Sequence, residues 1–264
     1  MPRSTYYFEI NKVDKIKYKN SEISDKITQI FNLHKGRYGV RRVTMELVNQ
    51  GYTINHKRVQ RIMHEQKLFG KRSKEKYHSY KGKIGKVADN IINRDFKADR
   101  PLQKWTTDVS EFKFTWGKCY ISPILDMYTN EIISYDLSLS PNLKQISNML
   151  AKAFNKFPKP NNLILHSDQG WQYQHKYYVD ELKKRGITQS MSRKGNCYDN
   201  SIMETFFGRL KNEIYYGYEK RYSSFEEFSR SIEEYIDYYN NERIQSKTKW
   251  MPPTKYRLAS TTTN

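Results

Sequence analysis

The chain has 264 residues, and its 47 lysines and arginines outnumber its 28 aspartates and glutamates, which gives a formal net charge of +19. A hydrophobic content of 37% with 14% aromatic residues excludes wholesale disorder and allows a packed core. The large positive excess indicates a polyanionic partner. Nucleic acid fits better than a membrane surface, because the sequence has no long apolar run and no amphipathic anchor.

The charge distribution separates two regions of the chain, and the cysteine content bears on its cellular compartment. Residues 1–100 hold 24 Lys/Arg and 10 Asp/Glu, a net +14, whereas residues 101–264 hold 23 and 18, a net +5. Cys119 and Cys197 are far apart, so neither a disulfide framework nor a CxxC site is expected. The first ten residues lack the apolar stretch of a signal peptide. These features predict a cytoplasmic protein whose basic excess lies in its first third.

Residues 1–88 form the first predicted domain, a basic, helical, DNA-binding region. Apolar residues at helical spacing predict a helix at 40–49, Gly51 ends it, and Asn55 can cap a second helix. Two short helices joined by a glycine-containing turn predict a helix-turn-helix, although a purely structural helical hairpin has the same pattern. The basic side chains left outward, and expected to contact DNA, are Lys57, Arg58 and Arg61.

A strongly basic stretch follows these helices. Residues 67–86 contain eight Lys/Arg with two tyrosines and one phenylalanine between them, which predicts an arm along a nucleic-acid backbone. Lys71 and Arg72 are the residues of this arm expected to contact DNA. Residues 89–104 are interpreted as a linker.

The remainder predicts an α/β domain. Three antiparallel strands are expected at 105–114, 119–126 and 131–138, and two more strands at 163–166 and 187–190. Helices are expected at 143–154, 176–185, 200–216 and 225–240, and a mobile loop at 192–199. This order predicts a mixed five-stranded sheet with flanking helices, forming a catalytic core over 105–217. Residues 218–264 supply a C-terminal helix and tail.

Three carboxylates in this core are candidate metal ligands. Asp108 lies within a strand, where aspartate is disfavoured, and would share a face with Thr106 and Ser110. Asp168 follows a buried strand, at the place where open α/β sheets bind ligands. Glu204 lies in the first turns of a helix. Together they could hold a hard cation such as Mg²⁺, and a pair of such ions suits phosphodiester chemistry.

The spacing makes this interpretation specific. There are 59 residues between Asp108 and Asp168, 35 between Asp168 and Glu204, and Lys211 stands seven residues after Glu204 on the same helix face. This resembles the D-D-E pattern of transposases and retroviral integrases. The segments HSDQGWQYQ, SRKGNCYDNSIMETFFGRLKNE and YNNERIQSKTKWMPPTKYR resemble the insertion-sequence-three family of bacterial transposases, and residues 34–68 resemble its N-terminal helices.

The resemblance implies a ribonuclease-H-like transposase of the integrase type. It assigns catalysis and binding of two Mg²⁺ ions, which Mn²⁺ can replace, to Asp108, Asp168 and Glu204, and a DNA contact to Lys211. Arg193 and Lys194, in the loop before Glu204, are also expected to touch DNA. The implied partners are double-stranded DNA of element ends and target, further copies of the chain on paired ends, and the bacterial nucleoid. A retroviral zinc domain is excluded, because residues 1–100 contain no cysteine.

Two other functions stay open at this point: a nuclease of the same fold, and a non-catalytic DNA-binding regulator. Single residues also have two interpretations. His166 orients water or phosphate, or is a hydrogen-bonded residue at a strand end. Asn200 touches DNA, as Asn196 and Tyr198 could, or it caps the helix of Glu204. Core packing is favoured over base stacking for Trp105, Phe206 and Phe207.

The N-terminal sequence PRSTYYFEI resembles a segment within the second reading frame of the family. The resemblance therefore implies that an upstream reading-frame product, with its own helix-turn-helix and a heptad zipper, acts with this chain in cis or in trans. Residues 1–88 show no run of three or four heptads.

Overall fold

The computed structural model describes residues 2–71, 88–193 and 197–262. It divides into two compact units, Met1–Arg72 and Ser73–Asn264. Arg72 and Lys194, both expected to contact DNA, and Asn196 lie outside the described residues. Within the described ranges, none of the helices combines the length and apolar character needed to cross a lipid bilayer.

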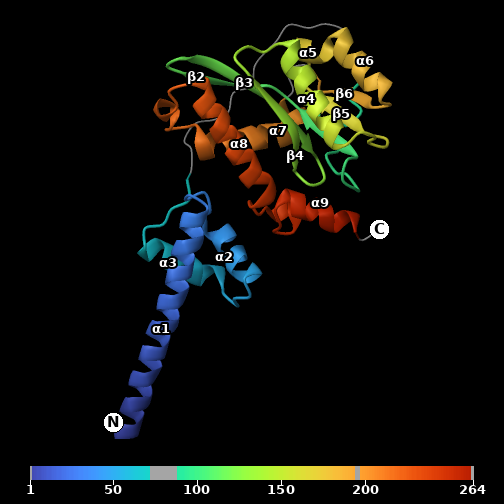
Figure 1. Ribbon diagram of the computed structural model, residues 1–264. Coiled ribbons are helices and arrows are strands. Elements are labelled where there is room, and N and C mark those ends of the chain that lie inside the picture. The colour runs from blue at the N-terminus through green and yellow to red at the C-terminus, as the bar shows by residue number, and fades with distance from the viewer. Residues whose placement is uncertain (1, 72–87, 194–196, 263–264) are drawn as a thin grey trace. The chain divides into compact units, whose positions relative to one another are not determined.

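The first unit contains three helices, α1 (Arg3–Leu33), α2 (Val40–Asn49) and α3 (His56–Glu65) (Figure 1). The helix expected at 40–49 is confirmed. So is the cap on the next one, because the Asn55 side chain accepts a hydrogen bond from the Lys57 amide at 2.9 Å. The buried side chains of this unit include Ile27, Ile30, Tyr38, Val43, Leu47, Val59, Ile62 and Met63.

The second unit is built on a mixed sheet. Its strands are β1 (Lys104–Thr107), β2 (Ser110–Phe114), β3 (Gly117–Asp126), β4 (Ile132–Ser138), β5 (Ile164–Ser167) and β6 (Thr188–Met191). β3 runs antiparallel to β4 on one side and to both β1 and β2 on the other. β1, β5 and β6 are parallel neighbours. The predicted mixed sheet is confirmed, but it has six strands instead of five.

The additional strand arises because the stretch expected at 105–114 is interrupted at Asp108 and Val109. β3 pairs Ile124 with Thr107 and Ile121 with Ser110, so the register is the same on both sides of the interruption. This register places Pro123 opposite Asp108. Proline has no N–H group to donate to a neighbouring strand, and the ladder opens at this point.

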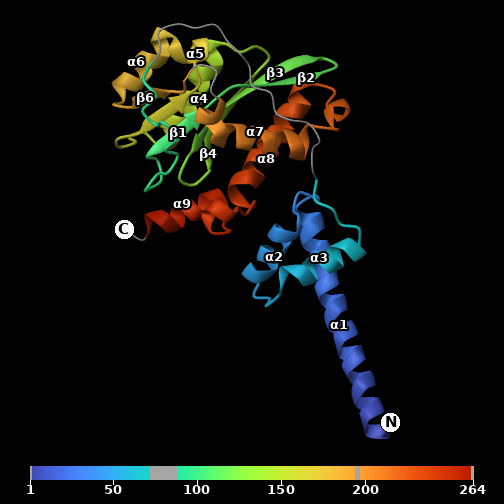
Figure 2. The same cartoon turned by 180° about the vertical axis from the view of Figure 1, so that it is seen from behind.

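Helices cover both faces of the sheet (Figure 1, Figure 2). On one face, Trp105 belongs to a buried cluster with residues of α4 (Leu143–Lys156) and α6 (Lys176–Lys184). A short helix that the sequence did not predict, α5 (Trp171–Gln174), contributes Tyr173 to the same cluster. On the other face, Phe112 contacts α8 (Phe225–Asn241) through Phe228, with ring centroids 4.9 Å apart.

The helix α7 (Ser201–Ile214) is braced by the C-terminal residues. The Arg243 guanidinium is 2.6 Å from a carboxylate oxygen of Glu213 on α7, and both side chains are nearly buried. The Tyr235 hydroxyl of α8 donates to the same carboxylate at 3.1 Å. The chain ends with α9 (Pro253–Thr261). The segment expected as a C-terminal helix and tail therefore holds the helix that carries Glu204.

Candidate active site

The two aspartates lie next to each other at one edge of the sheet. Lys104 pairs with Ile164, and Thr106 pairs with His166, in the parallel ladder of β1 and β5. Continuing this register places Asp108 beside Asp168, just past the carboxyl ends of the two strands. The structure thus brings together two residues that are far apart in sequence.

Each aspartate leaves one carboxylate oxygen for a ligand. Asp108 Oδ1 accepts from the amide of Val109 at 2.7 Å, and Asp168 Oδ1 accepts from the amide of Gly170 at 2.9 Å. Within the described ranges, neither Oδ2 atom accepts a hydrogen bond. A Cβ on Gly170 would lie 2.9 Å from Asp168 Oδ1 and 2.6 Å from Gln172 Nε2, so a larger residue at 170 would displace these side-chain ends.

Electrostatics links these aspartates to α7. Burial raises the pKa of Asp108 well above its usual range, and the charges of Asp168 and Glu204 raise it further. Burial also raises the pKa values of Asp168 and Glu204. Burial lowers the pKa of Lys211, whose Nζ lies 5.1 Å from the centroid of the Phe112 ring, while Glu111 and Asp108 oppose that shift. Burial therefore disfavours the ionised form of all three carboxylates, and the charges of Asp168 and Glu204 add to this effect at Asp108.

The donor set suits a hard divalent cation, because all three groups are carboxylates and Mg²⁺ prefers oxygen ligands. No three His, Cys, Asp or Glu side chains form a ready metal cluster in the part of the chain that the structure describes. Asp108 and Asp168 stand side by side, so the residues fit an ion held by this pair. For Glu204 to bind the same ion, its side chain would have to approach the pair.

The other residues expected to contact DNA are spread over both units. On α3, Lys57 and Arg61 are exposed, and Arg61 lies 3.7 Å from Glu65. Arg58 is partly buried, and Lys71 is exposed. Arg193, in the second unit, is half-exposed. Exposure alone does not show a DNA contact, so the contacts expected at these residues stay predictions.

His166 is a buried strand-end residue with both ring nitrogens bonded, so the structural interpretation holds. Its Nε2 lies 3.0 Å from the carbonyl oxygen of Asp199, which can only accept, so Nε2 carries the proton. Its Nδ1 then accepts from the Ser190 hydroxyl at 2.9 Å. Burial lowers the pKa of His166 to about 4, and the ring is neutral at pH 7.

This histidine should make the protein sensitive to acid. Its folded-state pKa of about 4 lies below the ordinary 6.5, so the unfolded chain binds a proton more readily between these values. The free energy of unfolding should fall by up to about 3 kcal/mol as the pH drops from about 6.5 to 4. Urea titrations should show a shallower fall for His166→Gln. His56→Gln, at an exposed position on α3, is the control; equal pH dependence in both variants would contradict the prediction.

The predicted cap at Asn200 is wrong. Asn200 stands at the N-cap position of α7 but makes no capping hydrogen bond. Its Oδ1 accepts from the Thr106 hydroxyl at 2.6 Å, and its Nδ2 donates to the Thr107 carbonyl at 3.4 Å. Asn200 thus attaches the start of α7 to β1. The core interpretation of the three aromatic residues is confirmed, since all are fully buried: Trp105, Phe206 and Phe207.

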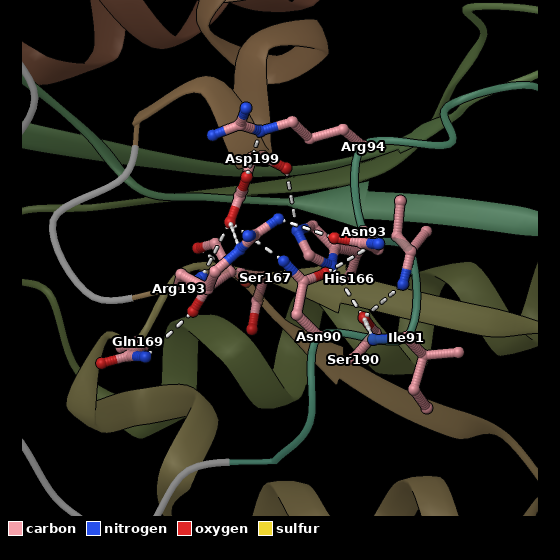
Figure 3. Close-up of polar contacts among 12 residues, drawn as sticks. Asn90, Ile91, Asn93, Arg94, His166, Ser167, Gln169, Ser190, Arg193 and Asp199 are labelled. Atoms are coloured by element: carbon pink, nitrogen blue, oxygen red, sulfur yellow. Dashed lines mark hydrogen bonds and ion pairs between the residues drawn. The ribbon is translucent and has the colours of Figure 1, made fainter.

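One residue that the sequence did not single out occupies a central position. Asp199 is buried and receives hydrogen bonds from Asn90, Arg94 and Arg193 (Figure 3). Its partners come from distant parts of the chain, including the segment expected to be a linker. In the sequence, the one feature that could have drawn attention to Asp199 is its place just before the helix that carries Glu204.

Known families match most of the chain. Residues 17–76 match an HTH-like domain, and residues 98–197 and 204–260 match two models of an integrase core domain.

A solved structure of the simian T-cell lymphotropic virus intasome in complex with the PP2A regulatory subunit B56 gamma has a TM-score of 0.52 at 12% identity. It covers 88% of this chain, and 74% of that chain is matched. A magnesium complex of the HTLV-2 integrase catalytic core, in its trimeric form, has a TM-score of 0.50 at 12% identity over 61% of this chain and 99% of that chain. The fold is therefore that of the ribonuclease-H-like integrase cores.

An integrase core together with a helix-turn-helix-like domain defines a DNA transposase or integrase. The chain is 46% identical to a protein of Escherichia coli K12 named "Putative transposase InsK for insertion sequence element IS150", over 97% of this chain and 90% of that protein. It is 32% identical to transposase InsF for insertion sequence IS3A of the same strain, over 86% of this chain and 78% of that protein. The chain belongs to the insertion-sequence-three family of bacterial transposases.

Proposed function

We propose that this transposase cleaves and joins DNA strands at element ends with divalent metal held by Asp108, Asp168 and Glu204. The observation that carries the proposal is the parallel register of β1 and β5, which places Asp108 beside Asp168. Bound Mg²⁺ or Mn²⁺, as a pair of ions, would activate water and stabilise the attacking and leaving oxygens. Asp108 and Asp168 offer their unbonded oxygens, α7 presents Glu204, and Lys211 on the same helix contacts DNA.

The decisive experiment incubates the full chain with end-containing and scrambled duplexes, with Mg²⁺, with Mn²⁺ or with chelator. Metal-dependent nicking and joining that favours the element end supports the proposal. Nicking without joining or end preference would indicate a plain nuclease. Binding without any cleavage would indicate a regulator.

Further partners belong to the same proposal. We expect several copies of the chain on paired ends, in keeping with the intasome, a multi-component assembly, as a structural relative. An upstream reading-frame product supplies further recognition of the ends, in cis or in trans. A Shigella flexneri relative, named as a probable transposase for IS1353, is 30% identical over 98% of this chain, which spans only 50% of that relative. A longer protein can therefore contain this whole arrangement.

The chain alone should prefer element ends only weakly. A single short recognition helix, α3, reads few base pairs, and each base contact contributes about 1–3 kcal/mol of discrimination. Phosphate contacts add affinity without sequence information. Competition between end-containing and scrambled DNA at near-physiological salt should show a small preference, which rises when the upstream region is fused. A preference of about a thousandfold by the chain alone would contradict this expectation.

A further inference from the structure

The buried carboxylate of Asp199 holds two half-exposed arginines (Figure 3). Its Oδ1 accepts from Arg94 Nε at 2.9 Å. Its Oδ2 accepts from the Arg193 amide at 3.0 Å, from Arg193 Nε at 3.2 Å and from Asn90 Nδ2 at 2.9 Å. The Asp199 side chain is 0% exposed, whereas those of Arg94 and Arg193 are 48% and 52% exposed. The buried Asp199 carboxylate therefore orients both arginine side chains, while about half of each side chain stays exposed to solvent.

The segment before β1 completes this arrangement. Arg193 Nη2 donates to Asn93 Oδ1 at 2.6 Å, and the Asn93 amide donates to Asn90 Oδ1 at 2.8 Å. Ser190 on β6 accepts from the amides of Ile91 and Ile92, at 3.0 and 3.3 Å. The stretch expected to be a linker is thus attached to the sheet edge, and it carries Arg94 with it.

The two arginines lie near the carboxyl ends of the parallel strands, where Asp108 and Asp168 also lie. β5 and β6 are parallel and pair Ser167 with Met191, so the next register position sets Ser192 beside Asp168. Arg193 is the following residue. Asp199 stands five residues before Glu204, and its carbonyl accepts from His166 two residues before Asp168. A DNA strand that reaches Asp168 therefore passes close to Arg193.

A purely stabilising role accounts poorly for this geometry. The buried Asp199 carboxylate needs a cationic partner, but one arginine is enough to neutralise one aspartate, so the second arginine is not explained by this pairing. The planar guanidinium matches phosphate oxygens, and ordering it before binding lowers the entropy lost when DNA binds. Two ordered arginines around one carboxylate keep a net positive charge, as a polyanion site requires.

We propose that Arg94 and Arg193 form a phosphate-binding pair for the DNA backbone beside the active carboxylates, with Asp199 as the positioning residue that orders both. The proposal rests on the proposed function for its substrate, DNA. It adds Arg94 and Asp199 to the residues that receive this substrate.

The test is DNA binding by the full chain in chelator, with a generic duplex over a range of salt concentrations. Arg94→Gln and Arg193→Gln should each reduce the slope of log K against log salt by about 0.9 and weaken binding several-fold near 0.1 M salt. Arg185→Gln is the matched control, because Arg185 pairs with Glu181 on α6. Slopes for Arg94→Gln and Arg193→Gln equal to the control slope would overturn the phosphate-binding pair.

Asp199→Asn tests the positioning role through the sign of its effect. The substitution removes a negative charge, so net charge alone predicts tighter DNA binding. Loss of ordering predicts weaker binding, which is the result we expect; tighter binding by a folded variant would overturn the role of Asp199.

If Asp199→Asn does not fold, as judged by its Tm, the variant Arg94→Lys tests the same positioning role. It should keep the wild-type slope yet bind more weakly, and wild-type affinity would overturn the positioning role. These binding measurements need neither metal nor cleavage, so a failure of the proposed catalytic function would not change their outcome.

Discussion

Asp108→Asn, Asp168→Asn and Glu204→Gln should each abolish DNA cleavage and joining while DNA binding survives. Each substitution keeps the shape of the side chain but removes a charged oxygen ligand. We expect the cleavage rate to fall by at least about a thousandfold, equivalent to about 4 kcal/mol of transition-state stabilisation. Single-turnover cleavage of end-containing DNA in Mg²⁺ measures the loss, and gel-shift titration in chelator measures the binding that remains.

The same variants should be at least as stable as the wild type when no metal is present. The pKa of Asp108 is raised in the folded state, so its ionised form costs stability at neutral pH. Asparagine removes this cost, and Tm should hold or rise at pH 7. The difference from wild type should shrink as the pH falls and should vanish toward about pH 3, below the ordinary aspartate pKa of about 3.9, where Asp108 is protonated in both the folded and the unfolded chain.

Asp237→Asn is the matched control for these variants. Asp237 lies on the exposed side of α8, where it accepts from Asn241 at 2.7 Å. The substitution makes the same change of charge far from the proposed chemistry, so cleavage should persist. Metal-dependent cleavage retained by Glu204→Gln would remove Glu204 from the site, and loss of DNA binding in all three variants would point to misfolding.

Deleting residues 1–88 should flatten the salt dependence of DNA binding. This region holds 21 Lys/Arg and 7 Asp/Glu. If roughly six phosphates are neutralised, log K should fall with log salt at a slope of about −5 for the full chain. The deletion should bring the slope much closer to zero, because only the phosphate contacts of the second unit remain.

The position of the cut matters for this experiment. Asp89 accepts from the amide of Met191 at 3.2 Å, and the residues after it bond to β6, so the deletion must end at Ala88 to leave the sheet edge intact. A double variant of the full chain, Lys57→Gln with Arg61→Gln, tests the exposed side of α3 and should reduce the slope by about 2. An unchanged slope after the deletion would assign the DNA-binding surface to the second unit.

Local signals predicted the two short helices of the first unit, α2 and α3, but not the long helix α1. The helix at 40–49 matches the structure because its apolar spacing and the following Gly51 are properties of that stretch alone. The cap at Asn55 succeeded for the same reason, since its acceptor is two residues away. Asn200 failed as a cap because Thr106, 94 residues away in sequence, takes its side chain.

The candidate site was predictable only in part. The spacing of the carboxylates singled out Asp108, Asp168 and Glu204 as candidates, but the opening of the strand at Asp108 depends on pairing with Pro123, which sequence periodicity cannot show. Asp199 was missed for a related reason. Its burial and its bonds to Arg94 and Arg193 exist only once three separate stretches of chain have met.

The opening between β1 and β2 also restricts how this fold can change length. Thr106 bonds to the residue before α7, and Phe112 packs against α8, so both lie on one face across the opening. Successive residues of a strand point to opposite faces, and one inserted residue would turn Phe112 away from α8 and toward α4. Insertions at 108–109 should therefore be accepted only in pairs, and Val109 itself packs against the buried cluster that contains Trp105. The segment carrying the first aspartate is therefore constrained both in its length and in the apolar residue that follows the aspartate.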